Sequence, residues 1–142
     1  MSWVVDTCVL LDILEDDPEF GRASARCLAA RLDEGLVACP VTLLEMAPAF
    51  VGDFDLQRDF LAQCGVSDRV DFTLADARSG YSPWNDYIIA KRQRKFPKLA
   101  KRPVADIMIG AFACRFDGLI TRNGSDFRPW FPNLVLLDPT VC

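Results

Sequence analysis

Four acidic residues, far apart in the chain, stand beside segments that are predicted to be strand ends or helix starts. They are Asp6, Glu45, Asp106 and Asp126. Carboxylates gathered in one cleft repel one another, and their pKa values rise unless cations compensate. Mg²⁺ or Mn²⁺ supplies that charge and prefers oxygen ligands. The corresponding chemistry is metal-assisted phosphodiester hydrolysis, because a bound ion lowers the pKa of its water.

The chain contains no histidine. This excludes Ser-His and Cys-His nucleophile pairs, imidazole bases and imidazole metal ligands. The cysteines show neither a CxxC pair nor zinc-type spacing, and they stand at Cys8, Cys27, Cys39, Cys64, Cys114 and Cys142. We interpret them as reduced thiols of the core, with disulfides in an oxidising compartment as the alternative. Any enzymatic chemistry would therefore depend on carboxylates.

The elements that would position the acids follow from the hydrophobic pattern. Short apolar runs predict strands, and amphipathic or apolar segments between them predict helices. The predicted strands cover residues 3–5, 36–39, 66–72, 119–121 and 134–138. The predicted helices cover residues 18–35, 40–50, 54–64, 74–95 and 103–116, with Gly80 and Pro83 disturbing the fourth. This alternation indicates a parallel sheet covered on both faces.

Ligands of such sheets bind beyond the carboxyl ends of the strands, where the strand order reverses. Asp6 directly follows the first predicted strand, and Asn123 and Asp126 follow the fourth. Glu45 and Asp106 lie early in helices that can start from the same edge. We therefore expect the four acids to converge there.

Each acid also has a purely structural interpretation. Glu45 matches the capping box that starts at Thr42, and from this stretch alone the cap is favoured. Asp106 would be a first-turn residue stabilised by the helix dipole. Asp6 and Asp126 could cap the segments that follow them. None of these interpretations explains why all four acids fall at one edge of the sheet.

Composition limits the class of protein. Half of the 142 residues are hydrophobic and a quarter are charged, so one globular domain spanning residues 1–142 is the simplest organisation. No apolar run approaches the roughly 20 residues needed to cross a bilayer, and no signal segment opens the chain. We expect a cytoplasmic protein without membrane contact. The net charge of −4 argues against non-specific attraction of polyanions.

Four segments together span nearly the whole chain: VVDTCVLLDIL, PVTLLEMAP, RPVADIMIGAFA and LITRNGSDFRPWFPNLVLLDP. In this order they resemble the four motif blocks of PIN-domain ribonucleases, and most closely the VapC-type toxins of bacterial toxin–antitoxin pairs. The specific parts are the final block and the Ala-Asp-X-X-Ile-Gly-Ala pattern of residues 105–111. The resemblance implies a three-layer α/β/α PIN-like fold with a five-stranded parallel sheet, and Mg²⁺- or Mn²⁺-dependent endoribonuclease activity. It also implies a homodimer that a small antitoxin silences by covering the cleft.

Matching positions give the implied roles of individual residues. Asp6 and Asp106 would be the principal metal ligands. Glu45 and Asp126 would complete the ion site or orient the attacking water. Accessory polar positions, which could hydrogen-bond the carboxylates, metal-bound waters or phosphate, are matched by Thr7, Thr121 and Asn123.

A basic segment stands out against the acidic net charge. Residues 91–102, KRQRKFPKLAKR, hold seven cations and no anion. Such a run is most often a solvated helix end or loop, but it could also contact RNA phosphates. Its candidate RNA-binding residues are Lys91, Arg92, Arg94 and Lys95. Trp84 or Tyr87 could stack on a base, although inward packing is the interpretation we favour for Trp84.

Two other functions compete with the nuclease. A haloacid dehalogenase-like phosphatase also places an Asp after its first strand, but it requires a second acid two residues later, where this chain has Cys8. A non-catalytic PIN-like module would bind RNA or a partner protein without cutting. The intact set of four acids argues against that module.

Overall fold

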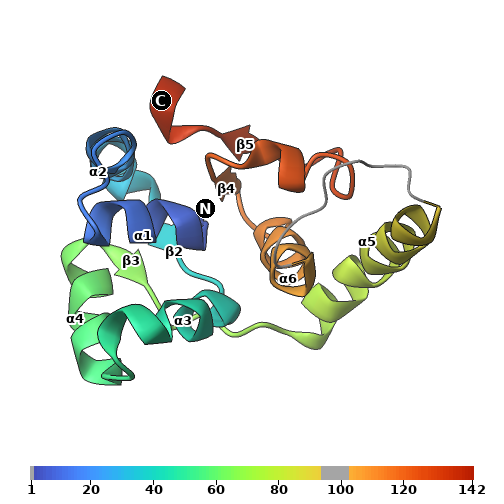
Figure 1. Cartoon of the computed structure of the whole chain (residues 1–142), viewed down its shortest axis with the longest axis horizontal. Coiled ribbons are helices and arrows are strands. Elements are labelled where there is room, and N and C mark those ends of the chain that lie inside the picture. Colours follow the sequence, from blue (N-terminus) through green and yellow to red (C-terminus); the bar gives the residue numbers. More distant parts are fainter. Residues whose placement is uncertain (1, 94–102) are drawn as a thin grey trace.

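A single parallel sheet lies at the centre of the computed structural model, which describes residues 2–93 and 103–142 (Figure 1). Its strands are β1 Trp3–Val5, β2 Leu36–Val37, β3 Val66–Ser67, β4 Gly118–Ile120 and β5 Leu136–Leu137. They are arranged in the order β3-β2-β1-β4-β5, so the strand order reverses between β1 and β4. The predicted five-stranded parallel sheet is confirmed, although β2, β3 and β5 are shorter than the runs that predicted them.

Helices connect these strands. They are α1 Thr7–Leu14, α2 Gly21–Ala30, α3 Pro40–Met46, α4 Phe54–Gln63, α5 Leu74–Arg92 and α6 Pro103–Ala113. Short 3₁₀ segments are η1 Leu32–Glu34, η2 Ala47–Phe50, η3 Gly124–Asp126 and η4 Pro139–Val141.

Both faces of the sheet are covered. Val5 and Ile120 pack with residues of α1, α2 and α4 on one face. Val4 and Leu119 point to the opposite face and pack with residues of α6. Beyond α6 lies α5, which runs beside it in Figure 1. These layers confirm the predicted three-layer α/β/α architecture.

The helix α5 is continuous, so the prediction that Gly80 and Pro83 would disturb it is wrong. Thr73 caps its start through a capping box with Asp76. Gly80 faces α6, where an added Cβ would lie 3.2 Å from the Cβ of Ala111. The absence of a side chain at residue 80 therefore lets α5 and α6 approach closely. This packing stabilises α5 as a helix even though it contains Pro83.

The cysteines are all free thiols, but the prediction that they belong to the core holds only in part. Cys27 and Cys39 are buried, and Cys8 and Cys64 are partly buried. Two others are exposed, because they stand just after α6 and at the last position of the chain: Cys114 and Cys142. Across residues 2–93 and 103–142, no helix is long and apolar enough to span a membrane.

Candidate carboxylate site

The carboxyl ends of β1 and β4 meet where the strand order reverses. Val5 is in register with Ile120, and the N–H of Asp6 donates to the carbonyl oxygen of Ile120 at 2.9 Å. Asp6 and Thr121 therefore leave the sheet side by side. This is the position at which open parallel sheets bind their ligands.

Asp6 is a buried carboxylate held by three donors. It is 5% exposed, and its Oδ1 accepts the backbone N–H of Thr7 at 2.8 Å, which caps α1. Its Oδ2 accepts the hydroxyl of Thr121 at 2.7 Å and the thiol of Cys8 at 3.4 Å. The predicted capping role is confirmed, and the second oxygen is turned toward the end of β4.

The surroundings of Asp6 raise its pKa above the ordinary value of an aspartate. Burial raises the pKa of Asp6, and the nearby charge of Glu45 raises it further. The hydrogen bonds from Thr121, Cys8 and Thr7 lower this pKa without offsetting the effect of burial. A cation beside Asp6 would favour the ionised carboxylate, because opposite charge stabilises the charged form.

Glu45 contacts the start of α1. The hydroxyl of Thr7 donates to Glu45 Oε1 at 2.7 Å and lies 3.0 Å from the hydroxyl of Thr42. The helix α3 begins at Pro40 with Cys39 at its N-cap, so Thr42 lies inside the helix. The capping-box interpretation of Thr42 and Glu45 is therefore wrong. Proline is favoured at the first helical position. Pro40 therefore starts α3 two residues before Thr42.

The other two acids are partly buried and stand on elements that reach the same edge. Asp106 lies in the first turn of α6, as its structural interpretation predicted. That helix packs against α3 and leads into β4, so its first turn lies toward the carboxyl ends of the strands. Asp126 is the last residue of η3, beyond β4, and Asn123 is the N-cap of that segment.

The described residues do not assemble all four acids into a metal centre. In the part of the chain that the structure describes, no group of three or more Cys, Asp and Glu side chains is arranged so that it could hold a metal ion. Asp6 and Glu45 are brought together, with Thr7 between them. Mg²⁺ is commonly bound through one or two carboxylates plus waters, which this pair can supply. Whether Asp106 and Asp126 join them stays a prediction.

The accessory positions connect the strand ends to the carboxylates. Thr121 donates to Asp6 and accepts the backbone N–H of Asn123 at 3.0 Å. Asn123 thus contributes its main chain to this hydrogen-bond chain. Thr7 contributes its N–H to Asp6 and its hydroxyl to Glu45. The loop after β4 and the start of α1 are joined by this network.

An ion pair that was not predicted from the sequence lies beside the site. The guanidinium of Arg122 contacts the carboxylate of Asp12 at 2.6 Å, and Asp12 is buried. A signal was available, since an acid within the apolar segment VVDTCVLLDIL requires a partner when it is buried. Only the fold shows that Arg122 is that partner.

The basic segment is described only at its start. Lys91 and Arg92 are exposed in the last turn of α5, whereas Arg94 and Lys95 lie outside the described residues. Tyr87 is buried, so its predicted availability for base stacking is wrong. Trp84 stacks on Tyr87 with ring centroids 5.5 Å apart and packs against the α6 side of the core, as favoured for it.

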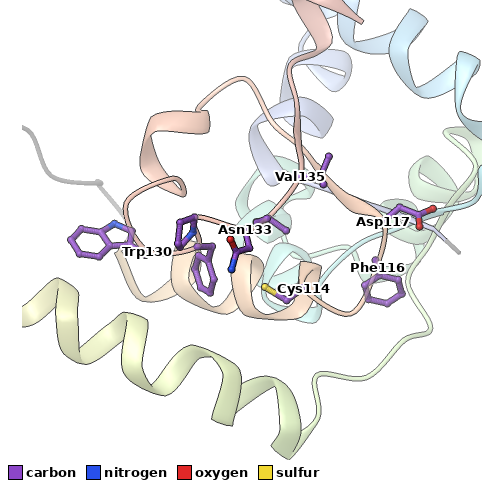
Figure 2. Close-up of a pocket in the computed structure, with 9 residues that line it drawn as sticks. Cys114, Phe116, Asp117, Trp130, Asn133 and Val135 are labelled. Atoms are coloured by element: carbon purple, nitrogen blue, oxygen red, sulfur yellow. The ribbon is translucent and has the colours of Figure 1, made fainter.

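A cavity of about 330 Å³ lies elsewhere (Figure 2). Asp117 and Val135, which line it, directly precede β4 and β5, so the cavity is at the amino ends of the strands. Figure 2 shows Trp130 at one end of the cavity and Asp117 at the other. It is therefore at the opposite edge of the sheet from Asp6.

In its fold the chain is similar to a chain in the crystal structure of VapBC2 from Rickettsia felis bound to a DNA fragment from their promoter. The TM-score is 0.64, and the alignment covers 97% of this chain and 98% of that chain. The sequences are 14% identical, so the likeness establishes the fold. No protein-family model matches the sequence, and no curated protein sequence is significantly similar to it.

Proposed function

We propose that this protein is a metal-dependent endoribonuclease of the PIN-domain type that hydrolyses RNA phosphodiester bonds. The observation that carries the proposal is Asp6, a buried carboxylate of raised pKa beside Glu45, at the point where the strand order reverses. A cation bound beside this carboxylate would offset its desolvation and the repulsion from Glu45. The donor groups here are mainly oxygens, which suit Mg²⁺ or Mn²⁺.

In this proposal, each polar residue of the candidate site has a separate role. Asp6 and Asp106 would be the principal ligands of the ion, and Glu45 and Asp126 would complete its site or orient the attacking water. When bound, Mg²⁺ or Mn²⁺ supplies a water of lowered pKa and stabilises charge on the phosphate. Thr121 keeps Asp6 Oδ2 fixed by its hydroxyl. A carboxylate held in this way reorganises little during the reaction.

The biological setting is proposed from the fold. The likeness to a chain of VapBC2, together with the sequence motifs, supports a VapC-type toxin of a toxin–antitoxin pair. Its partners would be an antitoxin protein and a second copy of this chain in a homodimer, and it would act in the cytoplasm. Co-purification with the product of a small neighbouring reading frame tests the antitoxin.

The direct test is incubation of purified protein with total RNA, with and without Mn²⁺, followed by mapping of the cut ends. We expect cleavage that requires the ion and falls by about 100-fold or more in Asp6→Asn, because an amide binds a divalent cation poorly. The variant keeps the shape of the side chain, and its circular dichroism spectrum is compared with that of the parent to check that it folds. Equal cleavage by parent and variant would refute the role of Asp6.

RNA binding by the basic segment is a separate part of the proposal. Neutralising Lys91, Arg92, Arg94 and Lys95 together should weaken RNA binding and flatten its dependence on salt, because fewer counterions are released. Filter binding over a salt series measures both. Identical salt slopes for parent and variant would assign these cations to a solvated surface.

The alternative is a non-catalytic PIN-like module that binds RNA or a protein. Its specific support is that no group of three or more acids and thiols within residues 2–93 and 103–142 could hold a metal ion. A parent protein that binds RNA but neither binds Mn²⁺ nor cuts would establish this alternative.

A further inference from the structure

A partly buried ion pair joins the loop after β4 to α1 outside the carboxylate site. Arg122 Nε donates to Asp12 Oδ2 at 2.6 Å, and Arg122 Nη2 donates to Asp12 Oδ1 at 3.2 Å. The side chain of Asp12 is 6% exposed and that of Arg122 is 29% exposed. Two nearly parallel bonds from a planar guanidinium fix orientation as well as distance.

Arg122 is also held by the corner between α1 and α2. Its guanidinium carbon lies 4.5 Å from the ring centroid of Phe20, the residue before α2. The main chain of Asp12 is equally constrained, because its carbonyl oxygen accepts the N–H of Asp17 at 2.9 Å. A Cβ on Gly21 would lie 2.8 Å from that same oxygen. The ion pair is thus closely packed against the corner between α1 and α2.

Its position in the chain connects this corner to the candidate site. Arg122 directly follows Thr121, whose hydroxyl donates to Asp6, and Asp12 belongs to the helix that Asp6 caps. The helix that Asp6 caps and the loop that begins at Thr121 are therefore joined both at the candidate site and at the ion pair. Without the ion pair, the hydrogen bonds at the site itself would have to hold the loop in place.

Buried ion pairs commonly add little net stability, since desolvation offsets the attraction of the charges. They do impose geometry. We propose that Arg122 is a positioning residue: through Asp12 it holds residues 121–126 against α1 so that Thr121 stays hydrogen-bonded to Asp6. The effect on RNA cleavage rests on the proposed function, whereas the effect on the loop does not.

The test compares Arg122→Met with a matched control. Arg115→Met removes a similar ion pair, in which Arg115 Nε lies 2.6 Å from Asp76 Oδ1 with side chains 37% and 1% exposed. Arg115 precedes β4, at the edge of the sheet opposite the candidate site. Arg122→Lys keeps the charge and one donor group. If Arg122→Met does not fold, the double variant Asp12→Asn/Arg122→Met is used in its place, because it leaves no unpaired buried charge.

Native-state amide hydrogen exchange is the first readout. The N–H groups of Asn123, Asp126 and Phe127 are hydrogen-bonded within the loop. In Arg122→Met we expect them to exchange at least about tenfold faster than in the parent, as local opening becomes easier. Arg122→Lys should lie between the two, and Arg115→Met should match the parent after correction for global stability. Unchanged exchange, or an equal increase in Arg115→Met, would overturn the proposal.

RNA cleavage is the second readout. We expect kcat of Arg122→Met to fall about tenfold with KM nearly unchanged, because misplacement of a positioned carboxylate slows the chemical step. Arg122→Lys should restore part of kcat. Parental kcat in Arg122→Met would contradict a positioning role. A parent that cuts no RNA refutes the proposed function, and the exchange of the loop amides then decides the role of Arg122 by itself.

Discussion

At the scale of single residues, burial and hydrogen-bond donors act in opposite directions on the pKa of Asp6. Burial and the charge of Glu45 raise the pKa of Asp6, and the hydroxyl of Thr121 opposes them. The neutral hydroxyl lowers the pKa of Asp6 without taking the place of the cation that the site would bind. The strength of binding for a metal should therefore depend on residue 121.

Thr121→Val tests this dependence with a side chain of nearly the same shape. Losing the 2.7 Å hydrogen bond to Asp6 should raise the pKa of Asp6 further. We expect Mn²⁺ affinity and RNA cleavage to fall about tenfold, since a hydrogen bond to a charged group contributes roughly 1.5–3 kcal/mol. Calorimetric titration with Mn²⁺ measures the affinity. Thr121→Ser keeps the hydroxyl and should behave like the parent; an equal loss in Ser and Val would rule out the hydroxyl as the cause.

The thiols differ in reactivity for a related reason. Burial raises the pKa of Cys39 to about 12, and it raises the pKa of Cys27 to about 12. At pH 8 these thiols stay protonated, and the thiolate is the reactive form. We expect a short maleimide pulse to label Cys114 and Cys142 first, as read by mass spectrometry. Complete labelling should require denaturant, and rapid labelling of Cys39 in the folded protein would contradict its burial.

At the scale of elements, one sequence pattern gave two outcomes. Thr73 and Asp76 form a capping box at the start of α5, with N–H to oxygen distances of 2.9 and 3.2 Å. Thr42 and Glu45 have the same spacing, but Pro40 starts their helix earlier. The pattern stabilises a helix start only where the first of its two residues is itself the cap.

Asp76→Asn should make this helix start less stable in a pH-dependent way. Burial raises the pKa of Asp76, but hydrogen bonds from Arg115 and from the N–H of Thr73 outweigh it, and the net pKa is lowered. The carboxylate therefore stabilises the fold above its unfolded pKa of about 3.9, and this contribution is lost as pH falls through the lower folded pKa. At pH 7 we expect a loss of roughly 1.5–3 kcal/mol in the free energy of unfolding.

Urea denaturation of parent and variant between pH 7 and pH 2 measures this difference, which should shrink toward the acid end. Asp59→Asn, which replaces an exposed carboxylate on α4, serves as the control and should show no such difference. A constant gap between parent and Asp76→Asn at all pH values would mean that packing, and not charge, accounts for the loss.

At the scale of the whole molecule, the topology sets the site. The strand order reverses between β1 and β4, and every strand is parallel to its neighbours. Elements distant in sequence therefore deliver their polar ends to one edge of the sheet. An ion bound there would link α1, α3 and the loop after β4, and it would stabilise only the folded chain.

Millimolar Mg²⁺ or Mn²⁺ should accordingly raise the melting temperature. A ligand at about 100 times its Kd adds about 2.7 kcal/mol to the stability. For a chain of this size that corresponds to roughly 5–10 °C. Differential scanning fluorimetry over a metal series measures the shift, and Asp6→Asn should abolish it. A melting curve that does not respond to either ion would argue against a formed metal site.

The class of fold and the positions of the polar strand ends could be predicted from the amino-acid pattern alone. Alternating apolar runs and helical segments predicted the parallel sheet, because burial on both faces leaves a periodic pattern in the chain. The same pattern identified Asp6 after the first strand, and Asn123 and Asp126 after the fourth, as candidate site residues. The start of α3 at Pro40 was also predicted, whereas the continuity of α5 through Gly80 was not, because it depends on packing against α6.

Which side chains meet became clear only from the folded chain. Glu45 contacts Thr7, and Asp12 pairs with Arg122 across a separation of 110 residues. Pairings of this kind depend on strand order and on the angles at which helices pack, and no local spacing encodes either of them. The sequence therefore indicates the candidate acidic residues. The packing of the sheet and its loops determines which side chains lie beside them and shift their pKa values.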